Sequence, residues 1–237
     1  DAHAHLDREG LKEIYPSLAR CRSLADIQRL IRAQAGRRKP GEWIVTMPVG
    51  APPFYQGMPE GLAEKRWPTR VDLDAAAPHH PVYVRGIWGY WNRPPVHSVA
   101  NSRALALAGV GRGTVPPPGV EIVRDAAGEP TGLFVEHNLI QVLEFTLMRA
   151  APRFTPDDRV RALRVSQRRY AARGVTAVYE GHGIAPEVLA AYRESHARGQ
   201  LRLRCSLALS PTWPAAEAAR PIPPLAAWAG GRGLGGD

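Results

Sequence analysis

At residues 175–179 the chain reads Val175-Thr176-Ala177-Val178-Tyr179, a β-branched stretch that predicts a strand. A helix is expected before it, because Thr155-Pro156 is typical of a helix start and Gly174 of a helix end. A second helix is expected over 186–198 and a second strand over 201–209. Helix and strand alternating at this spacing imply a right-handed crossover and a parallel sheet. The fold class is therefore α/β, either layered or a barrel.

Local composition and residue pattern divide the chain into three parts. Residues 1–36 contain a helix, since Leu24, Ile27, Leu30 and Ile31 have the spacing of one helix face. Residues 37–154 are rich in Pro and Gly and predict short strands joined by loops. Residues 155–237 hold the alternation described above.

Within the middle part, several short elements are predicted. Strands are expected at 43–47 and 82–87, and Asn101 is expected to cap a short helix that Gly109 ends. A turn sequence at 125–128 lies between two apolar stretches and predicts a hairpin. Residues 136–148 are expected to be helical.

Composition excludes several classes of protein. The 237 residues are 44% hydrophobic and 22% charged, which is typical of a globular chain and disfavours disorder. Two cysteines cannot form a disulfide framework, and no apolar run is long enough to cross a bilayer. We expect a cytoplasmic protein without membrane partners, although a segment preceding Asp1 would conceal any signal peptide.

The charge of the chain does not indicate a nucleic-acid partner. The net charge is +9, but only Lys12, Lys39 and Lys65 among the 31 basic residues are lysines. The arginines are scattered, whereas a nucleic-acid surface needs clustered cations. We expect a small-molecule substrate and no nucleic-acid partner, and the sequence leaves a homo-oligomer open.

The strongest chemical signal is His3-Ala4-His5, with Asp1 two residues before it. Residues two apart in a strand point to the same side, so both imidazoles can reach one metal ion. Neutral imidazole suits zinc and its first-row neighbours. Asp1 lies on the same face, as a further ligand or as a partner of the ligands. Alone, the pattern is weak, because surface strands also produce it.

Six segments in order resemble amidohydrolase family 3, the YtcJ-like branch of the amidohydrolase superfamily of metal-dependent hydrolases. The first is Asp1-Ala2-His3-Ala4-His5, and the others follow over residues 40–178. They are Pro40-Gly41-Glu42-Trp43-Ile44, Asp72-Leu73-Asp74 with Pro78, Asn101-Ser102-Arg103-Ala104-Leu105, Gly128-Glu129-Pro130-Thr131-Gly132 and Gly174-Val175-Thr176-Ala177-Val178.

The resemblance implies a partial (β/α)8 TIM barrel of the metal-dependent hydrolase type. Residues 1–5, 175–180 and 201–209 would form barrel strands 1 to 3, and residues 37–154 a large α+β insertion between strands 1 and 2. His3 and His5 would then lie where such barrels place their metals, at the C-terminal ends of strands.

The resemblance also implies the reaction, which is hydrolysis of a non-peptide carbon–nitrogen bond by water that a divalent metal activates. The metal is expected to be zinc, one ion or two. The family's other ligands and its general base come later than any residue here, so we expect a chain cut at both ends, forming the N-terminal portion of an enzyme and inactive alone.

Five further residues are candidates for substrate binding. Glu180 and His182 follow a strand, where the family has positions that face the substrate or support the metal ligands; a role in capping the loop is the open alternative. His97 precedes Asn101 by four residues, where the family usually has a histidine five before. Trp88 and Trp91 are candidates for an aromatic wall, although such a cluster is more often part of a core.

Two other functions stay open at this point. One is a different barrel hydrolase with an H-x-H pair, which the ordered segments disfavour. The other is a non-catalytic α/β binding protein that keeps the family's shell. A strand-4 lysine, two histidines and a late aspartate in the adjoining sequence would favour the metal-dependent amidohydrolase over the non-catalytic binding protein.

Overall fold

The computed structural model describes residues 1–86 and 93–209 and divides the chain into two compact units. Unit 1 is formed by Asp1–Ile14 with the chain from Phe154 onward, and unit 2 by Tyr15–Arg153. The predicted boundary at residue 36 thus falls inside unit 2. The physical reason is packing, because the buried face of the helix before it contacts the unit 2 core.

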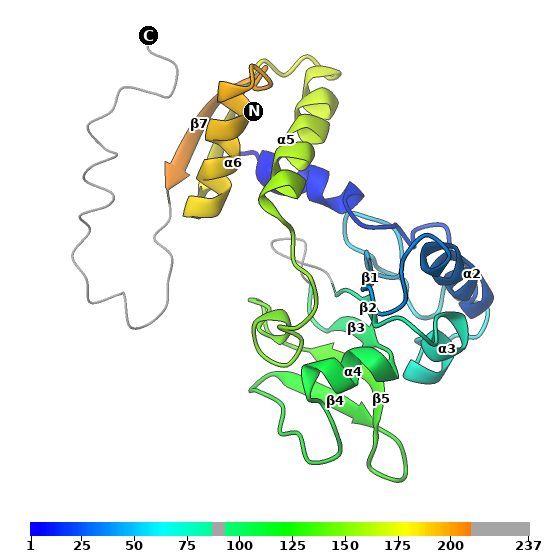
Figure 1. The fold of residues 1–237 in the computed structure, drawn as a ribbon. Helices are drawn as coiled ribbons and strands as arrows, with labels where there is room; N and C mark the ends of the chain where they lie inside the picture. The colour runs from blue at the N-terminus through cyan, green and yellow to red at the C-terminus, as the bar shows by residue number, and fades with distance from the viewer. Residues whose placement is uncertain (87–92, 210–237) are drawn as a thin grey trace. The chain divides into compact units, whose positions relative to one another are not determined.

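Unit 2 is built on a five-stranded mixed sheet (Figure 1). Its strands are β1 (Ile44–Thr46), β2 (Val82–Val84), β3 (Val96–Ala100), β4 (Val120–Arg124) and β5 (Pro130–Glu136). The order is β1-β2-β3-β5-β4, with β1 and β2 parallel and the other pairs antiparallel. The strand predicted at 43–47 and the predicted hairpin are confirmed; the strand predicted at 82–87 is confirmed over Val82–Val84, and residue 87 lies outside the described residues.

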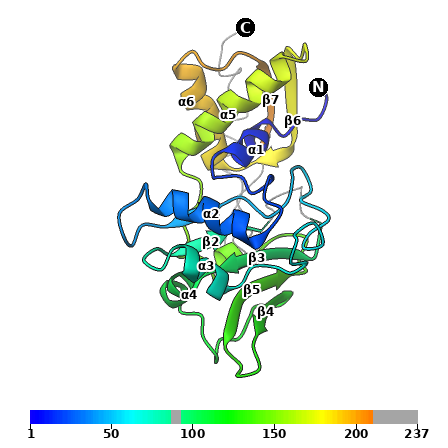
Figure 2. The ribbon, with the colours of Figure 1, turned by 90° about the vertical axis from the view of Figure 1, so that its right-hand side faces the viewer.

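Helices cover both faces of this sheet (Figure 2). On one face, α2 (Leu24–Ala35) and α3 (Arg70–Ala76) pack on Ile44, Val82 and Val84. On the other, α4 (Ser102–Ala108) packs with Val45, Tyr83 and Phe134. Alternate residues of one strand therefore enter different cores, which explains why every residue of β1 and β2 is buried.

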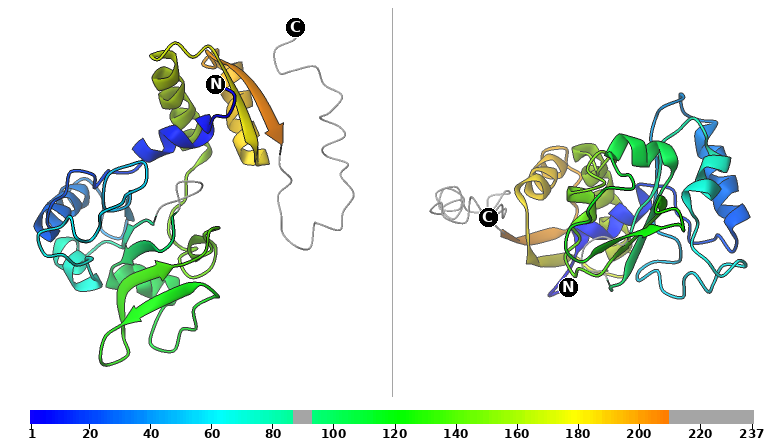
Figure 3. Two further views of the ribbon diagram at one scale, coloured as in Figure 1. Left: turned by 180° about the vertical axis from the view of Figure 1, so that it is seen from behind. Right: turned by 90° about the horizontal axis from the view of Figure 1, so that it is seen from below.

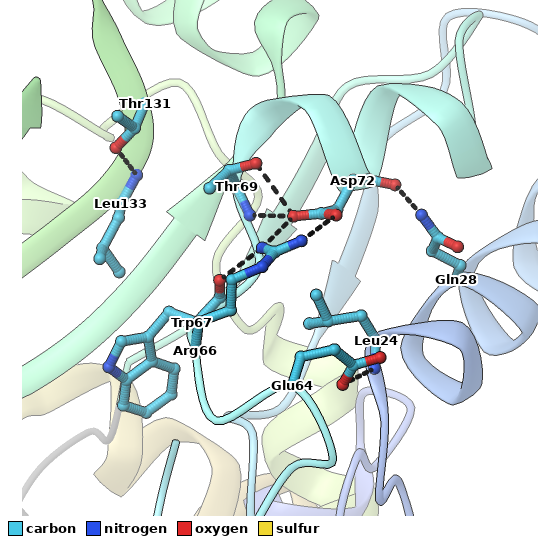
Figure 4. A network of polar contacts seen from close by, with 9 residues as sticks. All are labelled: Leu24, Gln28, Glu64, Arg66, Trp67, Thr69, Asp72, Thr131 and Leu133. Atoms are coloured by element: carbon cyan, nitrogen blue, oxygen red, sulfur yellow. Dashed lines mark hydrogen bonds and ion pairs between the residues drawn. The ribbon is translucent and has the colours of Figure 1, made fainter. Parts of the chain in front are cut away.

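The segments of the middle part that resemble a family have structural roles here. Thr69 and Asp72 form a capping box at the start of α3, and Arg66 binds both Asp72 carboxylate oxygens at 2.8 and 2.9 Å (Figure 4). The Asn101 side chain accepts from Ala104 N–H at 3.0 Å and from Val82 N–H at 2.8 Å. Asn101 thus caps α4, as predicted, and also ties it to β2.

The helix predicted over 136–148 is wrong. β5 extends through Glu136, and the only helical turn there is the 3-10 turn η3 (Leu143–Phe145). The Glu136 carboxylate accepts hydrogen bonds from Val142 N–H at 2.5 Å and Leu143 N–H at 3.3 Å. Because this side chain caps the turn from the preceding strand, residues 137–142 are held as a loop.

Unit 1 contains the parallel pair β6 (Ala177–Ile184) and β7 (Arg204–Leu209), as the sequence predicts (Figure 3). α5 (Pro156–Ala171) and α6 (Pro186–Ala197) pack with this pair around Val178, Leu163 and Leu189. The predicted helix start is confirmed, since Thr155 and Asp158 form a capping box.

The opening segment of unit 1 packs closely on α5. A short helix, α1 (Leu6–Glu9), continues into the 3-10 turn η1 (Gly10–Glu13). Gly10 donates its N–H to Ser166 Oγ at 2.7 Å, and a Cβ on Gly10 would lie 2.0 Å from the Ala162 carbonyl oxygen. Glycine is thus required by the close approach of two backbones. No helix in the described ranges has the length and apolar run that crossing a membrane needs.

Candidate metal centre

The first residues of unit 1 lie along β6 but do not form the regular strand that the sequence predicts. Ala4 N–H donates to the Tyr179 carbonyl at 2.8 Å, and Tyr179 N–H donates to the Asp1 carbonyl at 3.1 Å. His3 N–H instead donates to the Asp1 carboxylate at 3.0 Å. Because Asp1 takes this donor, the ladder with β6 is interrupted at His3. The expected strand over 1–5 is corrected to an irregular segment held on β6.

The two histidines of this segment lie together. Their ring centroids are 4.9 Å apart and the rings are nearly perpendicular, with His3 exposed and His5 half-buried. Burial, followed by the charges of Arg8 and His3, lowers the pKa of His5. Imidazole in its neutral form has a ring-nitrogen lone pair that can coordinate a metal, so the chemistry of two neighbouring histidines fits a first-row divalent ion.

The pair is not a complete metal site within the described part of the chain. There, no three His, Cys, Asp or Glu side chains come together in an arrangement able to hold an ion. The structure directs the Asp1 carboxylate to the backbone of His3. A catalytic zinc ordinarily has three protein ligands, so these residues supply two of the ligands such an ion needs.

Glu180 is fully buried in β6 and contacts the backbone that follows His5. Its Oε1 accepts hydrogen bonds from Leu6 N–H at 2.5 Å, Asp7 N–H at 3.2 Å and the Tyr192 hydroxyl at 2.6 Å. Leu6 is the first residue of α1 and follows His5. Glu180 therefore satisfies the free N–H groups at the start of α1 and fixes the chain directly after a histidine.

The buried acids around Glu180 have perturbed pKa values. Burial, and then the negative charge of Asp7, raise the pKa of Glu180 to about 7, more than its three donors lower it. Burial likewise raises the pKa of Asp7, against the lowering effect of Arg8, whose Nε lies 3.5 Å from the Asp7 carboxylate. Burial and then Glu180 raise the pKa of Tyr192. Glu180, Asp7 and Tyr192 thus form a desolvated cluster of acidic groups next to the backbone that follows His5.

Sequence reasoning missed Asp7 and Tyr192 as members of this cluster. Asp7 carried a usable signal, because it continues the alternation of Asp1, His3 and His5. Tyr192 carried none, since its contact with Glu180 joins α6 to β6 and no local pattern reports such a pair. Substrate contact by Glu180 stays a prediction, and the contacts described here are structural.

The other predicted site residues lie elsewhere. His97 is in β3 of unit 2, where its ring stacks on Trp67 with centroids 4.4 Å apart and planes 16° from parallel. Burial, and then His137, lower its pKa. His182 is in β6, but its side chain lies outside the described structure, as do Trp88 and Trp91 entirely.

Comparison with known proteins adds a family match. A family model described as "Amidohydrolase family" matches residues 1–228. The amidohydrolase YtcJ of Bacillus subtilis (strain 168) is 27% identical over 213 residues, covering 87% of this chain and 36% of that protein. An N-substituted formamide deformylase of Arthrobacter pascens is 31% identical over 142 residues, covering 57% of this chain and 23% of that protein.

The fold of the chain is similar to that of two solved structures. Two uncharacterized metal-dependent hydrolases, from Pyrococcus furiosus and Pyrococcus horikoshii OT3, each match with a TM-score of 0.53 at 21% identity. The matches cover 86% and 88% of this chain but 36% and 35% of theirs. The chain thus spans about a third or less of the length of these relatives.

Proposed function

The chain belongs to the amidohydrolase family, and from that premise we propose that it carries the first metal ligands of a hydrolase that cleaves a non-peptide carbon–nitrogen bond. The observation that carries this proposal is the pairing of His3 and His5, with ring centroids 4.9 Å apart. A divalent ion, zinc in our proposal, would supply Lewis acidity toward an amide carbonyl and toward the attacking water.

In this proposal the chain's own residues bind the metal ion and orient its two histidine ligands. His3 and His5 provide imidazole nitrogens, and Asp1 fixes the backbone of His3 through a 3.0 Å hydrogen bond. Glu180 fixes the chain after His5 through Leu6 and Asp7. The remaining ligands and the general base are assigned to parts of the protein outside the described residues, because those residues offer no third ligand for the pair.

We further propose that unit 1 is part of a (β/α)8 barrel. The irregular segment 1–5 would occupy the place of the first barrel strand, β6 and β7 would be the next two strands, and unit 2 would be the insertion between segment 1–5 and β6. Support comes from the parallel pairing of β6 with β7 and from the position of residues 1–4 along β6. The amide-type bond is supported by the relative named as an N-substituted formamide deformylase.

Metal titration of the chain tests the proposal. Because the described residues offer only His3 and His5 as ligands, Co²⁺ is expected to bind weakly, with a dissociation constant of about 10 µM or more. His3→Ala and His5→Ala should each abolish the absorption of bound Co²⁺. The control is His196→Ala, which removes an exposed histidine from α6 of the same unit.

Two results would count against the proposal. Equal Co²⁺ binding by His3→Ala, His5→Ala and the unaltered chain would show that the pair is not the site. Stoichiometric zinc in the purified chain would refute the expected weak binding. Hydrolysis is measured separately with an N-substituted formamide, and we expect no turnover by the 237 residues alone.

A further inference from the structure

Unit 2 contains a cleft of about 300 Å³ that the proposed metal chemistry does not use. It is formed by the loop that follows β1, by Trp67 and by the chain entering β3. Its described lining is mostly apolar and aromatic. The lining residues include Phe54, Tyr55, Trp67, Arg93, Val96 and His97.

One wall of the cleft is a pair of stacked rings. His97 lies flat on Trp67, with centroids 4.4 Å apart. The indole of Trp67 points away from the Arg66–Asp72 pair that fixes the neighbouring backbone (Figure 4). The lowered pKa of His97 keeps this ring neutral near pH 7. The wall therefore offers flat, uncharged aromatic surface of the kind that binds another ring.

Another part of the cleft lining has a strained backbone. Tyr55 is 8% exposed and has a φ of 50°, in the left-handed region that aromatic residues rarely adopt. Its N–H donates to the Ala51 carbonyl at 2.9 Å, so the conformation is held by a turn. Backbone strain of this kind costs about 1–3 kcal/mol and is concentrated at ligand sites.

Among the described lining residues, Arg93 is the one whose side chain carries a permanent positive charge. The Arg93 guanidinium is centred 4.2 Å from the Phe54 ring and is exposed. Within the described residues Arg93 forms no ion pair, and none of the described lining residues is an acid. Arg93 is thus held by an aromatic ring rather than by a carboxylate, which leaves its N–H donors available to an anion.

We propose that this cleft binds a small molecule composed of one aromatic ring and one carboxylate. The ring lies against the Trp67–His97 wall beside Tyr55, and the carboxylate binds Arg93. The volume agrees, since a cavity of roughly 150 Å³ accommodates benzene and ligand sites begin near 300 Å³. The proposal is independent of the hydrolase function and does not require a metal.

The test compares three probes on the chain by ligand-detected NMR titration. Phenylacetate has both groups, phenylacetamide keeps the ring without the charge, and acetate keeps the charge without the ring. We expect phenylacetate to bind about tenfold more tightly than phenylacetamide, because Arg93 contributes a charged hydrogen bond. Acetate is expected to show no saturable binding.

Arg93→Gln is the matching variant, because it removes the charge of an exposed residue and keeps a polar side chain. It should weaken phenylacetate binding about tenfold and leave phenylacetamide within about twofold. Arg37→Gln, at an exposed arginine of the same unit, controls for net charge and should change neither. The proposal would be overturned if phenylacetate showed no saturable binding up to about 10 mM. An equal effect of both variants on phenylacetate binding would also overturn it.

Discussion

Glu180 and Leu6 are separated by 174 residues of sequence, yet the Glu180 carboxylate accepts the Leu6 N–H at 2.5 Å. This contact joins the strand β6 to the first residue of α1. Since His5 immediately precedes Leu6, the geometry of a proposed metal ligand depends on a buried acid from a distant part of the chain. The same carboxylate also accepts from Tyr192, so three elements of unit 1 meet at one oxygen.

Removing this acid should destabilise unit 1. Glu180→Ala leaves the N–H groups of Leu6 and Asp7 and the Tyr192 hydroxyl without their acceptor, at an expected cost of about 2–4 kcal/mol in the free energy of unfolding. Glu180→Gln keeps one acceptor oxygen and should cost less. Urea unfolding followed by circular dichroism measures both variants. An alanine variant as stable as the unaltered chain would contradict the assigned role.

The pH dependence of stability should carry the signature of Glu180. Its pKa is raised from 4.5 to about 7 in the folded chain. Between these values the native state holds a proton that the unfolded chain has lost, so this contribution to stability is complete below about pH 4.5 and is lost as the pH rises through 7.

Glu180→Gln removes that titration and is the comparison for it. The stability of the unaltered chain minus that of Glu180→Gln should fall by about 2–3 kcal/mol between pH 4.5 and 8. Urea midpoints at five pH values measure the difference. A difference that stays constant with pH would show that Glu180 titrates in the folded chain as it does in the unfolded one.

A methyl group at Gly10 should disrupt the packing of η1 on α5. The added Cβ would lie 2.0 Å from the Ala162 carbonyl oxygen, which is backbone and cannot turn aside. Gly10→Ala should therefore cost about 3 kcal/mol or more. Gly36→Ala is the control, because its nearest atom would be 3.7 Å away, and it should be neutral or slightly stabilising. Equal stabilities of the two variants would refute the close approach.

The stability of unit 2 should depend on a buried ion pair between Arg85 and Glu144. Arg85 and Glu144 are buried, and Arg85 Nε and Nη2 donate to the two Glu144 oxygens at 2.9 and 2.5 Å. Arg85→Met alone should cost about 3–5 kcal/mol, because it leaves a buried charge without its partner. The double variant Arg85→Met/Glu144→Leu should recover most of that loss. Additive losses in the thermal unfolding of the double variant would rule out this coupling.

Local signals in the sequence predicted the elements whose causes are local. Asn101 and Thr155 each cap the helix that follows, because their side chains accept a backbone N–H three residues on. The parallel pairing of β6 and β7 also followed from alternation alone. The histidine pair was predicted by its spacing, even though its segment is not a regular strand.

The failures have physical causes that act over longer range. Glu136 was expected in a helix, but its carboxylate caps η3 from the end of β5. Residues 15–36 were grouped with the first strand, yet Leu24, Ile27 and Ile31 are buried in unit 2. The contacts of Glu180 with Leu6 and Tyr192 join separate elements, and a single sequence does not report such pairs.

The division of unit 1 between two stretches of chain has a consequence for the order of folding. Tyr15–Arg153 is continuous, so unit 2 has every partner it needs once residue 153 has left the ribosome. The first fourteen residues must wait until β6, α6 and β7 have been synthesised, and their contacts span most of the chain. The proposed metal ligands are synthesised before unit 2, and yet they reach their native contacts only after it.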